Sequence, residues 1–299
     1  MIIIPISGGL GNQLFQYAFC IELENYISKI YTTDYFIKRD YAHNGYELKD
    51  VFNIHLRTNF CIDLLMRLIR KMLIFKHWYI VKIMFFLLKL TGVHFYEENE
   101  RFKLDFTVFA KRGRINILLG YWQSEYFFEK SMDKVRTVFC FNPTLLSLKT
   151  QEALYRITHT QSVSIHIRRG DYLNEKHKNT TGSVCTLKYY NLAIDLITDK
   201  VVNPFFYVFS DDIQWCKENI NIPNVEFISW NNKEDSWQDM FLMSACQHNI
   251  IANSSFSWWG AWLNRNKDKI VIAPAGYIYL YNENIHTVPS NWIKLEIGK

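Results

Sequence analysis

The stretch Ser164-Ile165-His166-Ile167-Arg168-Arg169-Gly170-Asp171-Tyr172 decides the fold of the second half of this chain. It begins with β-branched and apolar residues at alternate positions, which predicts a strand, and it ends in two arginines, a glycine and an aspartate. Arginine grips phosphate because its planar guanidinium donates parallel hydrogen bonds and stays charged. Open α/β sheets bind ligands at the carboxyl ends of their strands. The stretch therefore predicts a site for a nucleotide diphosphate.

On both sides of this stretch, apolar patterns predict strands that alternate with helices. The predicted strands are residues 163–168, 205–210, 225–229, 250–253 and 270–273, and the predicted helices are 187–198, 213–219, 237–247 and 256–263. Such alternation implies a parallel sheet with right-handed crossovers. The second half of the chain is therefore predicted to be an α/β domain.

The first half begins with a short apolar run, residues 2–6, which predicts a buried strand. A glycine-rich turn follows at residues 7–13, and a helical pattern continues to about residue 28. Glycine lets backbone N–H groups approach an anion, and a helix N-terminus favours the negative charge. The turn is neither a Walker A loop nor a strict G-x-G-x-x-G sequence, so it fits a phosphate cradle and a plain tight turn equally well.

The length and composition are typical of a globular protein with two domains. The chain has 299 residues, 49% hydrophobic and 21% charged, which excludes a disordered protein. Asn142-Pro143 interrupts the chain before a helical stretch that continues to about residue 160. We therefore predict a domain of residues 1–150 and a second domain of residues 151–299.

Residues 64–96 differ in character from the rest of the first domain. They contain six Lys or Arg residues, no acidic residue and many large apolar residues. No uncharged run approaches the roughly 20 residues that cross a bilayer. Two interpretations fit a basic helical insertion at about residues 60–100. It is either an amphipathic helix pair that lies on an anionic membrane, or a helical subdomain whose lysines face water.

Three predicted strands of the second half end in polar clusters. Because the carboxyl ends of parallel strands meet at one edge of a sheet, these clusters predict a single site. Their members are His166, Arg168, Arg169 and Asp171; Ser210, Asp211 and Asp212; and Asn253, Ser254 and Ser255.

The charged members of these clusters also fit structural roles. Arg168 and Asp171 could form an ion pair, and either Asp211 or Asp212 could cap the helix that follows. The two adjacent aspartates also suggest a metal site of the Asp-x-Asp kind. On an extended backbone, however, neighbouring side chains point apart, which disfavours a shared metal.

The remaining members have similar alternatives. Ser254 and Ser255 fit helix N-caps, and the free N–H groups of a capped helix also hold phosphate. His166 alternates with two isoleucines, so it is either a satisfied core histidine or a contact to a nucleotide base.

The cysteines and the charge limit the compartment and the partners. The six cysteines are scattered without a C-x-x-C pair, which argues against a zinc cluster and against a disulfide framework. The start lacks a charged region and a cleavage site, so no secretory signal is expected and we predict a cytoplasmic protein. A net charge of +5 suits an anionic small ligand or a membrane surface and does not require nucleic acid.

Four segments carry a family resemblance. They are Gly8-Gly9-Leu10-Gly11-Asn12-Gln13-Leu14-Phe15-Gln16-Tyr17, His166-Ile167-Arg168-Arg169-Gly170-Asp171-Tyr172, Phe209-Ser210-Asp211-Asp212 and Asn253-Ser254-Ser255-Phe256-Ser257-Trp258-Trp259-Gly260-Ala261-Trp262. In this order they resemble the motif set of the α-1,2-fucosyltransferases of glycosyltransferase family 11. Gly120-Tyr121-Trp122-Gln123-Ser124-Glu125 is similar to a further family segment. Residues 60–100 match nothing in that set.

The resemblance implies an α/β, GT-B-like fold of two Rossmann-like domains with the active site in the cleft between them. It implies a bacterial, inverting, metal-independent enzyme that needs no cofactor. Such an enzyme would move L-fucose from GDP-β-L-fucose to the 2-hydroxyl of a terminal galactose in an O-antigen or surface polysaccharide. The first domain would face the acceptor and the second would bind GDP-fucose.

The resemblance also implies roles for individual residues. Arg168 would bind the β-phosphate with help from Arg169, and His166 and Asp239 would contact the guanosine. Taking the resemblance and the strand-end clusters together, we predict that donor binding involves Gly8, Gly9, Gly11, Asn12, His166, Arg168, Asp211, Asp212, Asp239, Ser254 and Ser255, and that catalysis involves Arg168, Arg169 and Asp171. Asp171 is the candidate base because it shares the strand end, and its alternative role is to orient the arginines.

Competing functions follow from the same features. A non-catalytic GDP- or sugar-binding protein could use the same scaffold, and so could a glycosyltransferase with a different nucleotide sugar. The basic residues 64–96 suggest nucleic-acid binding, but no nucleic-acid motif accompanies them, so no nucleic-acid partner is expected. Peripheral association with the inner membrane surface is the remaining partner prediction.

Overall fold

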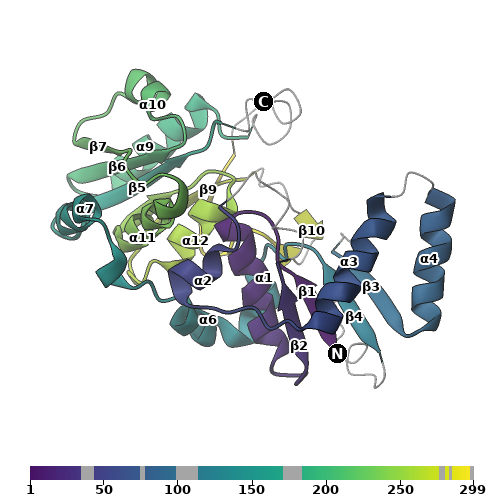
Figure 1. The fold of residues 1–299 in the computed structure, drawn as a ribbon. Coiled ribbons are helices and arrows are strands. Elements are labelled where there is room, and N and C mark those ends of the chain that lie inside the picture. Colours follow the sequence, from purple (N-terminus) through teal and green to yellow (C-terminus); the bar gives the residue numbers. More distant parts are fainter. Residues whose placement is uncertain are drawn as a thin grey trace. The chain divides into compact units, whose positions relative to one another are not determined.

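The computed structural model describes residues 1–34, 44–74, 78–98, 114–170, 184–275, 280–282 and 285–296 (Figure 1). The chain divides into two compact units. Unit 1 comprises residues 1–140 and 281–285, and unit 2 comprises residues 141–280 and 286–299. Each unit contains its own parallel sheet.

Unit 1 is built on a four-stranded sheet with the order β2-β1-β4-β3, whose neighbouring strands pair in parallel. Its elements are β1 (Ile2–Pro5), α1 (Leu10–Leu23), β2 (Ile30–Thr33), α2 (Glu47–Phe52), α3 (Phe60–Ile74), α4 (Trp78–Leu90), β3 (Val93–Glu97), β4 (Ile115–Leu119), the 3₁₀ helix η2 (Glu125–Ser131) and α6 (Met132–Val138).

Helices cover both faces of the unit 1 sheet. Successive side chains of a strand point to opposite faces. Ile2 and Ile4 pack in one apolar cluster with Phe19 of α1, whereas Ile3 packs in another with Met66 of α3. Helix α3 therefore covers one face of the sheet as part of the α/β fold. The helical insertion predicted at about residues 60–100 begins with this helix.

The predicted helical character of residues 60–100 is wrong at its end. Residues 93–97 form strand β3, which pairs with β4 along its whole length. The strand is only five residues long, and only Thr91 and Gly92 separate it from α4, so its apolar residues resemble a continuation of that helix.

Unit 2 is built on a six-stranded sheet with the order β12-β9-β8-β5-β6-β7, again parallel. Its elements are η3 (Pro143–Leu145), α7 (Leu148–Thr158), β5 (Gln161–Ile167), α9 (Leu187–Lys200), β6 (Pro204–Ser210), α10 (Ile213–Asn219), β7 (Val225–Ile228), η6 (Lys233–Asp235), α11 (Trp237–Ala245), β8 (His248–Ile250), α12 (Ser255–Leu263), β9 (Val271–Pro274) and β12 (Ile293–Leu295). Two short strands, β10 (Leu280–Asn282) and β11 (Ile285–His286), pair separately.

The unit 2 sheet is also covered on both faces, as strand β6 shows. Phe206 and Val208 pack in a cluster with α9 and α10, while Tyr207 and Phe209 pack in a cluster with α7 and α11. A parallel sheet between two helical layers is the Rossmann-like arrangement. The predicted fold class, α/β and GT-B-like with two Rossmann-like domains, is confirmed.

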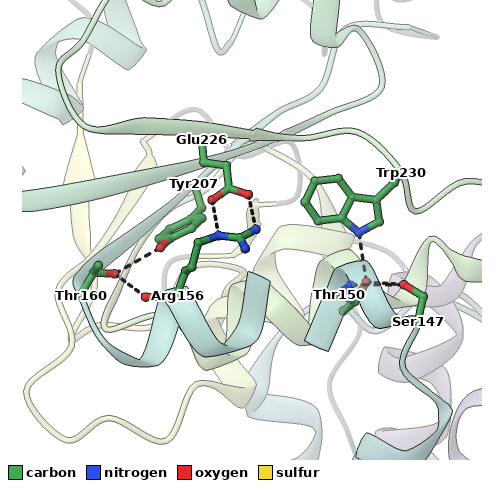
Figure 2. A network of polar contacts seen from close by, with 7 residues as sticks. All are labelled: Ser147, Thr150, Arg156, Thr160, Tyr207, Glu226 and Trp230. Atoms are coloured by element: carbon green, nitrogen blue, oxygen red, sulfur yellow. Dashed lines mark hydrogen bonds and ion pairs between the residues drawn. The ribbon is translucent and has the colours of Figure 1, made fainter. Parts of the chain in front are cut away.

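Helix α7 belongs wholly to unit 2, so the unit boundary falls before the predicted one. The Arg156 guanidinium donates two hydrogen bonds to Glu226 of β7, which Figure 2 draws as dashed lines. Their lengths are 2.9 and 2.6 Å. The hydroxyl of Thr160 lies 3.3 Å from that of Tyr207 on β6. A boundary at residues 150 and 151 would cut this helix, whereas the units separate at residues 140 and 141.

Strand β8 begins two residues before the predicted strand at 250–253. It starts at His248, and Asn249 inside it is fully buried. The Asn249 side-chain amide donates to the Ser164 hydroxyl at 2.7 Å and to the Met243 carbonyl at 2.8 Å. Because these bonds satisfy the Asn249 side-chain amide, this polar residue can lie inside a buried strand, although its hydropathy predicts a loop.

The strand order reverses direction at β5. From β5 the chain builds β6 and β7 on one side of the sheet, and then β8, β9 and β12 on the other. In open α/β sheets, ligands bind at such a reversal, outside the carboxyl ends of the two strands that flank it. The segments that follow β5 and β8 are therefore where a ligand site is expected in unit 2.

Candidate active site

The turn after β5 is held by one carboxylate, that of Asp211. An Oδ2 atom of Asp211 lies 3.1 Å from the Arg168 guanidinium. The same carboxylate accepts the backbone N–H of Arg169 at 2.9 Å and that of Gly170 at 3.1 Å. A side chain at Gly170 would place its Cβ 2.8 Å from the Asp211 carboxylate, so this carboxylate would have to shift if the glycine were replaced. Asp211 thus fixes both the first arginine and the backbone of the turn.

The second arginine is held as a fixed plane. The Nε of Arg169 donates to Asp212 at 3.1 Å, and its guanidinium carbon lies 3.8 Å from the centre of the Trp215 ring. This is a cation–π contact. Asp212 also caps α10, because its Oδ1 accepts the Trp215 N–H at 3.2 Å. The capping alternative for Asp212 is confirmed.

The two adjacent aspartates bind different partners. Asp211 bonds to the β5 turn and Arg168, whereas Asp212 bonds to Arg169 and caps α10. Among the residues that the structure describes, no group of three His, Cys, Asp or Glu side chains is placed to hold a metal ion. The observed contacts of this pair are those of arginine-orienting groups.

His166 is a buried side chain with an unmet hydrogen-bonding atom. It is 6% exposed, and its ring packs against Phe256 with the ring centres 5.8 Å apart. Burial, together with the charge of Arg168, lowers the pKa of His166 to about 3, so the imidazole is neutral at pH 7. Its Nδ1 has no hydrogen-bond partner among the described residues. Since burying such an atom costs free energy, His166 fits a ligand contact better than a satisfied core histidine.

The segment after β8 presents a helix N-terminus. Ser254 is the N-cap of α12, and its hydroxyl accepts the Phe256 N–H at 3.3 Å. Ser255 is the first residue of the helix. Trp258 and Trp259 anchor α12 because both are fully buried. The positive end of a fixed helix therefore lies at the strand-order reversal, where it favours an anion.

Asp239, in the first turn of α11, is a half-buried acid. Burial raises the pKa of Asp239 to about 7, against the opposing effect of a hydrogen bond from Asn231. The Nδ2 of Asn231 donates to the Asp239 carboxylate at 2.8 Å. Asn231 follows β7, so this pair belongs to the same sheet edge as the arginine turn.

A relay of hydrogen bonds from α7 orients Asn231. The Thr150 hydroxyl donates to the Oδ1 of Asn231 at 2.9 Å. The same hydroxyl accepts from the Trp230 indole at 3.1 Å and from Ser147 at 3.0 Å, the contacts drawn in Figure 2. With its Oδ1 committed to Thr150, the Asn231 amide must turn its Nδ2 toward Asp239. We call this series the Thr150 relay.

The glycine-rich turn of unit 1 is tightly built. Gly8 has a φ of +75°, and a Cβ there would lie 2.6 Å from the Asn12 side-chain amide. Gly9 is the N-cap of α1, and the Leu10 N–H bonds to the buried carboxyl of Glu47. Burial raises the pKa of Glu47. An acidic side chain therefore already meets the first turn of α1, which weighs against a phosphate at that N–H.

The segment after β4 joins this turn within unit 1. The Gln16 side chain accepts the Ser7 N–H and donates to the Gly120 carbonyl, both at 2.9 Å. The Gln123 amide donates to Asn12 at 2.7 Å. Two of the segments that carry the resemblance thus meet at the strand-order reversal between β1 and β4.

The structure brings together Arg168, Arg169, Asp211 and Asp212 as the sequence predicts. Asp171, the predicted base, lies outside the described residues. The donor-binding assignment of Gly8, Gly9, Gly11 and Asn12 stays a prediction, and so does that of Ser254 and Ser255.

Sequence reasoning missed Thr150, Trp215 and Asn231. Asn231 follows a predicted strand just as the other clusters do, so its position could have identified it. Thr150 and Trp215 carry no such signal, since each lies within a helix.

Comparison with known proteins gives one family model and two relatives that match nearly the whole chain, and a further relative that matches about half of it. The family model described as "Glycosyl transferase family 11" matches residues 1–296. An Escherichia coli alpha-1,2-colitosyltransferase is 34% identical over 306 residues, with 99% of each chain covered. The O-antigen biosynthesis glycosyltransferase WbnK of Escherichia coli is 33% identical, covering 97% of this chain and 99% of its own. A galactoside alpha-(1,2)-fucosyltransferase 1 from Saimiri boliviensis boliviensis is 30% identical over 155 residues, 49% of this chain and 42% of its own.

Proposed function

This chain belongs to glycosyl transferase family 11 and is a glycosyltransferase, and from that premise we propose that it transfers L-fucose from GDP-β-L-fucose to the 2-hydroxyl of a terminal galactose. The acceptor we propose is a glycan of the O-antigen or surface polysaccharide type. The names of its relatives support an α-1,2 linkage, and one of them supports a galactoside acceptor.

The observation that carries the proposal is the position of Arg168. It follows β5 at the strand-order reversal, its side chain is 33% exposed, and Asp211 holds one of its N–H groups. A guanidinium has five N–H donors, so it can bind Asp211 and a phosphate at once. When the bond between fucose and phosphate breaks, GDP gains negative charge, and we propose that Arg168 stabilises it.

Two groups of unit 2, buried His166 and half-buried Asp239, suit a guanine base. The edge of guanine carries N–H donors beside O6 and N7 acceptors. In the described part of the chain one hydrogen bond is recorded to the Asp239 carboxylate, and a carboxylate has sites for several more. Neutral His166 can form a hydrogen bond through Nδ1 without adding charge. These two groups support a purine nucleotide with N–H donors.

The proposed reaction inverts the anomeric centre in a single displacement. The acceptor hydroxyl attacks the fucose carbon from the face opposite GDP, and a base takes the hydroxyl proton. Arg168 and the N–H groups at the start of α12 would stabilise the departing diphosphate without a metal. Asp171 stays the predicted base. An Asp171→Asn variant is expected to lose turnover and to keep its affinity for GDP.

The test is fucose transfer to lactose by purified protein. Arg168→Ala is expected to lower kcat by roughly 100- to 1,000-fold, the effect of removing one charge-stabilising donor. Arg168→Lys is expected to recover part of the activity, because lysine keeps the charge and loses the planar fork. Arg265→Ala, an exposed arginine after α12, is the matched control and should leave kcat unchanged. Equal activity of Arg168→Ala and wild type would refute the proposal.

Metal independence is tested in the same assay. Transfer is expected to continue when EDTA is present. Loss of transfer on chelation and its return with manganese would contradict the metal-free reaction.

The donor has a second candidate, because the relative at 34% identity is named a colitosyltransferase. Colitose lacks the 3-hydroxyl of fucose, and losing one hydroxyl contact can change donor choice strongly. A screen of GDP-fucose, GDP-colitose, GDP-mannose and UDP-sugars separates these donors, followed by linkage analysis of the product. Preference for GDP-colitose would replace fucose in the proposal, and preference for a UDP-sugar would reject the guanine site.

A non-catalytic binding protein makes a different prediction. It would be stabilised by GDP and would turn over no donor with any galactoside. Release of GDP from GDP-fucose that depends on lactose excludes this alternative.

A further inference from the structure

Helix α4 of unit 1 is apolar on two opposite sides. Its inner side packs on the sheet: the Phe85 ring meets Phe95 of β3 edge-on, with centres 4.6 Å apart, and Leu88 packs on the adjoining apolar cluster. Its outer side carries large apolar residues that are each more than half exposed, namely Tyr79, Ile83, Phe86, Leu87 and Leu90.

The outer residues form one stripe. At about 100° per residue they fall within an arc of about 100°, and Phe85 and Leu88 lie roughly opposite this arc. Single exposed apolar residues are common on soluble proteins, but a contiguous row of five on one helix marks a contact surface. We call this row the α4 stripe.

The charges around the α4 stripe are positive. Lys82 and Lys89 are exposed and lie along one border of the stripe. The neighbouring α3 adds exposed Arg67 and Lys71. Asp63, in the first turn of α3, is the one acidic residue in the sequences of the two helices.

Helix α3 adds apolar area as well. Phe60, Leu64 and Leu68 are exposed on it, while Met66 is buried against the sheet. The two helices pack against each other and are drawn in blue in Figure 1. The pair therefore exposes apolar residues and positive charge together.

We propose that the α4 stripe, with the exposed side of α3, docks on an anionic phospholipid surface. Apolar residues bordered by lysines are the pattern of a helix that lies in the plane of a membrane interface. A protein partner would need an acidic, apolar groove, whereas anionic lipid offers both features over any area.

The dimensions agree with docking rather than crossing. Helix α4 has 13 residues, about 20 Å long at about 1.5 Å per residue, against a hydrocarbon core of about 30 Å. In the described part of the chain, no helix is both long and apolar enough to cross a bilayer.

The test is sedimentation of the purified full chain with vesicles. One set contains phosphatidylcholine alone, and the other contains equal amounts of phosphatidylcholine and phosphatidylglycerol. The protein should bind the mixed vesicles, bind the neutral ones at least tenfold more weakly, and dissociate as salt rises.

Paired variants assign the binding to the stripe. Ile83→Ser with Leu90→Ser is expected to weaken binding at least tenfold, because both side chains would otherwise enter the interface. Leu148→Ser with Val202→Ser, which alters two apolar residues of unit 2 that are more exposed than Ile83 and Leu90, should bind like wild type. Lys82→Gln with Lys89→Gln should weaken binding roughly tenfold or more, and Lys149→Gln with Lys217→Gln should not.

Three outcomes would overturn the proposal: no vesicle binding, equal binding to neutral and anionic vesicles, or equal effects of the stripe variants and their controls. A dimer that dissociates in Ile83→Ser with Leu90→Ser, without vesicle binding, would assign the face to a second copy. Unchanged melting temperatures confirm that the variants fold. The experiment measures no transfer, so its result is independent of the proposed reaction.

Discussion

At the scale of single residues, Asp211 fixes the position of Arg168. It holds Arg168 by an ion pair and the turn after β5 by two backbone N–H groups. In the proposed reaction, Arg168 would thus meet the donor phosphate in a geometry that a neighbouring strand sets. If Arg168 stabilises the leaving GDP as proposed, Asp211 acts on the reaction through Arg168, as a positioning residue.

Asp211→Asn is expected to lower kcat/KM for GDP-fucose by roughly 10- to 100-fold. The amide keeps the shape but loses the charge that orients Arg168, and charge-assisted bonds contribute roughly 1.5–3 kcal/mol. Steady-state kinetics and the Kd for GDP measure the effect. Asp195→Asn, an exposed aspartate of α9, is the control. A variant that melts earlier but keeps kcat/KM would show that Asp211 serves stability alone.

Asp239 is expected to make the protein less stable as pH rises. Its pKa is about 7 in the folded chain and about 3.8 when unfolded. The folded state therefore holds the proton more tightly, and stability falls between about pH 4 and pH 7 and is constant outside this window. Asp239→Asn is expected to remove this pH dependence. The removed fall in the free energy of unfolding is roughly 2 kcal/mol, once the partial exposure of Asp239 is taken into account.

The measurement is the melting temperature of wild type and Asp239→Asn from pH 5 to pH 8. Burial lowers the pKa of His166 and His248, which shifts stability in the opposite direction, so the difference between the two proteins isolates Asp239. Asp195→Asn should keep the wild-type slope. Parallel curves for wild type and Asp239→Asn would contradict an acid buried in its neutral form. We also expect the variant to bind GDP more weakly.

At the scale of elements, helix α7 orients Asn231, which follows strand β7, through the Thr150 relay. Thr150→Val keeps the shape and removes the hydroxyl, which leaves Asn231 and Trp230 without their partner. We expect the free energy of unfolding to fall by about 1–3 kcal/mol and GDP to bind several-fold more weakly. Denaturant unfolding and calorimetry measure the two effects.

Thr158→Val is the matched control for the relay. Thr158 is an exposed threonine of the same helix. Among the described residues, its hydroxyl bonds to the carbonyls of Leu154 and Tyr155 in that helix and to the ring of the adjacent His159. Its substitution should change neither quantity by more than about 0.5 kcal/mol. Wild-type stability and GDP affinity in Thr150→Val would show that the Thr150 relay does not orient Asn231.

The turn before α1 should be more sensitive than a similar turn nearby. Gly8 and Gly45 both have positive φ, of +75° and +83°. A Cβ at Gly8 meets the Asn12 amide, whereas a Cβ at Gly45 meets nothing within 4 Å. Both Ala variants carry backbone strain. Gly8→Ala is expected to lower the free energy of unfolding by about 1 kcal/mol more than Gly45→Ala, and this difference measures the clash with Asn12. Equal melting temperatures for the two variants would contradict the close approach.

Elements with long uniform patterns could be predicted from the sequence. The strand 205–210 and the helix 213–219 are found within one residue of the prediction, because apolar runs and turn residues both mark them. Strand β3 was missed because only Thr91 and Gly92 separate its five residues from α4. Strand β8 was misplaced because Asn249 is buried and satisfied by side chains from elsewhere in the chain.

Contacts within the site were harder to predict than its residues. The strand-end rule gathers Arg168, Arg169, Asp211 and Asp212 on one edge without further information. It cannot say that Arg169 pairs with Asp212, 43 residues away, or that Thr150 bonds to Asn231, 81 residues away. Such pairings depend on how helices pack on the sheet, which local sequence does not encode.

At the scale of the molecule, each unit has its own apolar core and its own buried thiols. Cys20 is buried in unit 1, and Cys216 and Cys246 are buried in unit 2. Burial raises the pKa of all three thiols, that of Cys216 to about 11. Because a thiol reacts as thiolate and only when exposed, these cysteines are labelled only after their unit opens. Each cysteine therefore reports the opening of one unit.

GDP is expected to slow the labelling of Cys216 and Cys246 and to leave Cys20 unchanged. The groups proposed to bind GDP, Arg168 and Asp239 among them, lie in unit 2, and a ligand that binds only the folded unit stabilises that unit. At 100 times its Kd, GDP adds about 2.7 kcal/mol, which slows labelling through full opening of unit 2 roughly 100-fold. Mass spectrometry of the labelled cysteines gives each rate, and exposed Cys61 and Cys140 serve as internal controls that react at once. Equal slowing of Cys20 would show that the chain opens as one cooperative unit, and no slowing at any cysteine would place GDP outside unit 2.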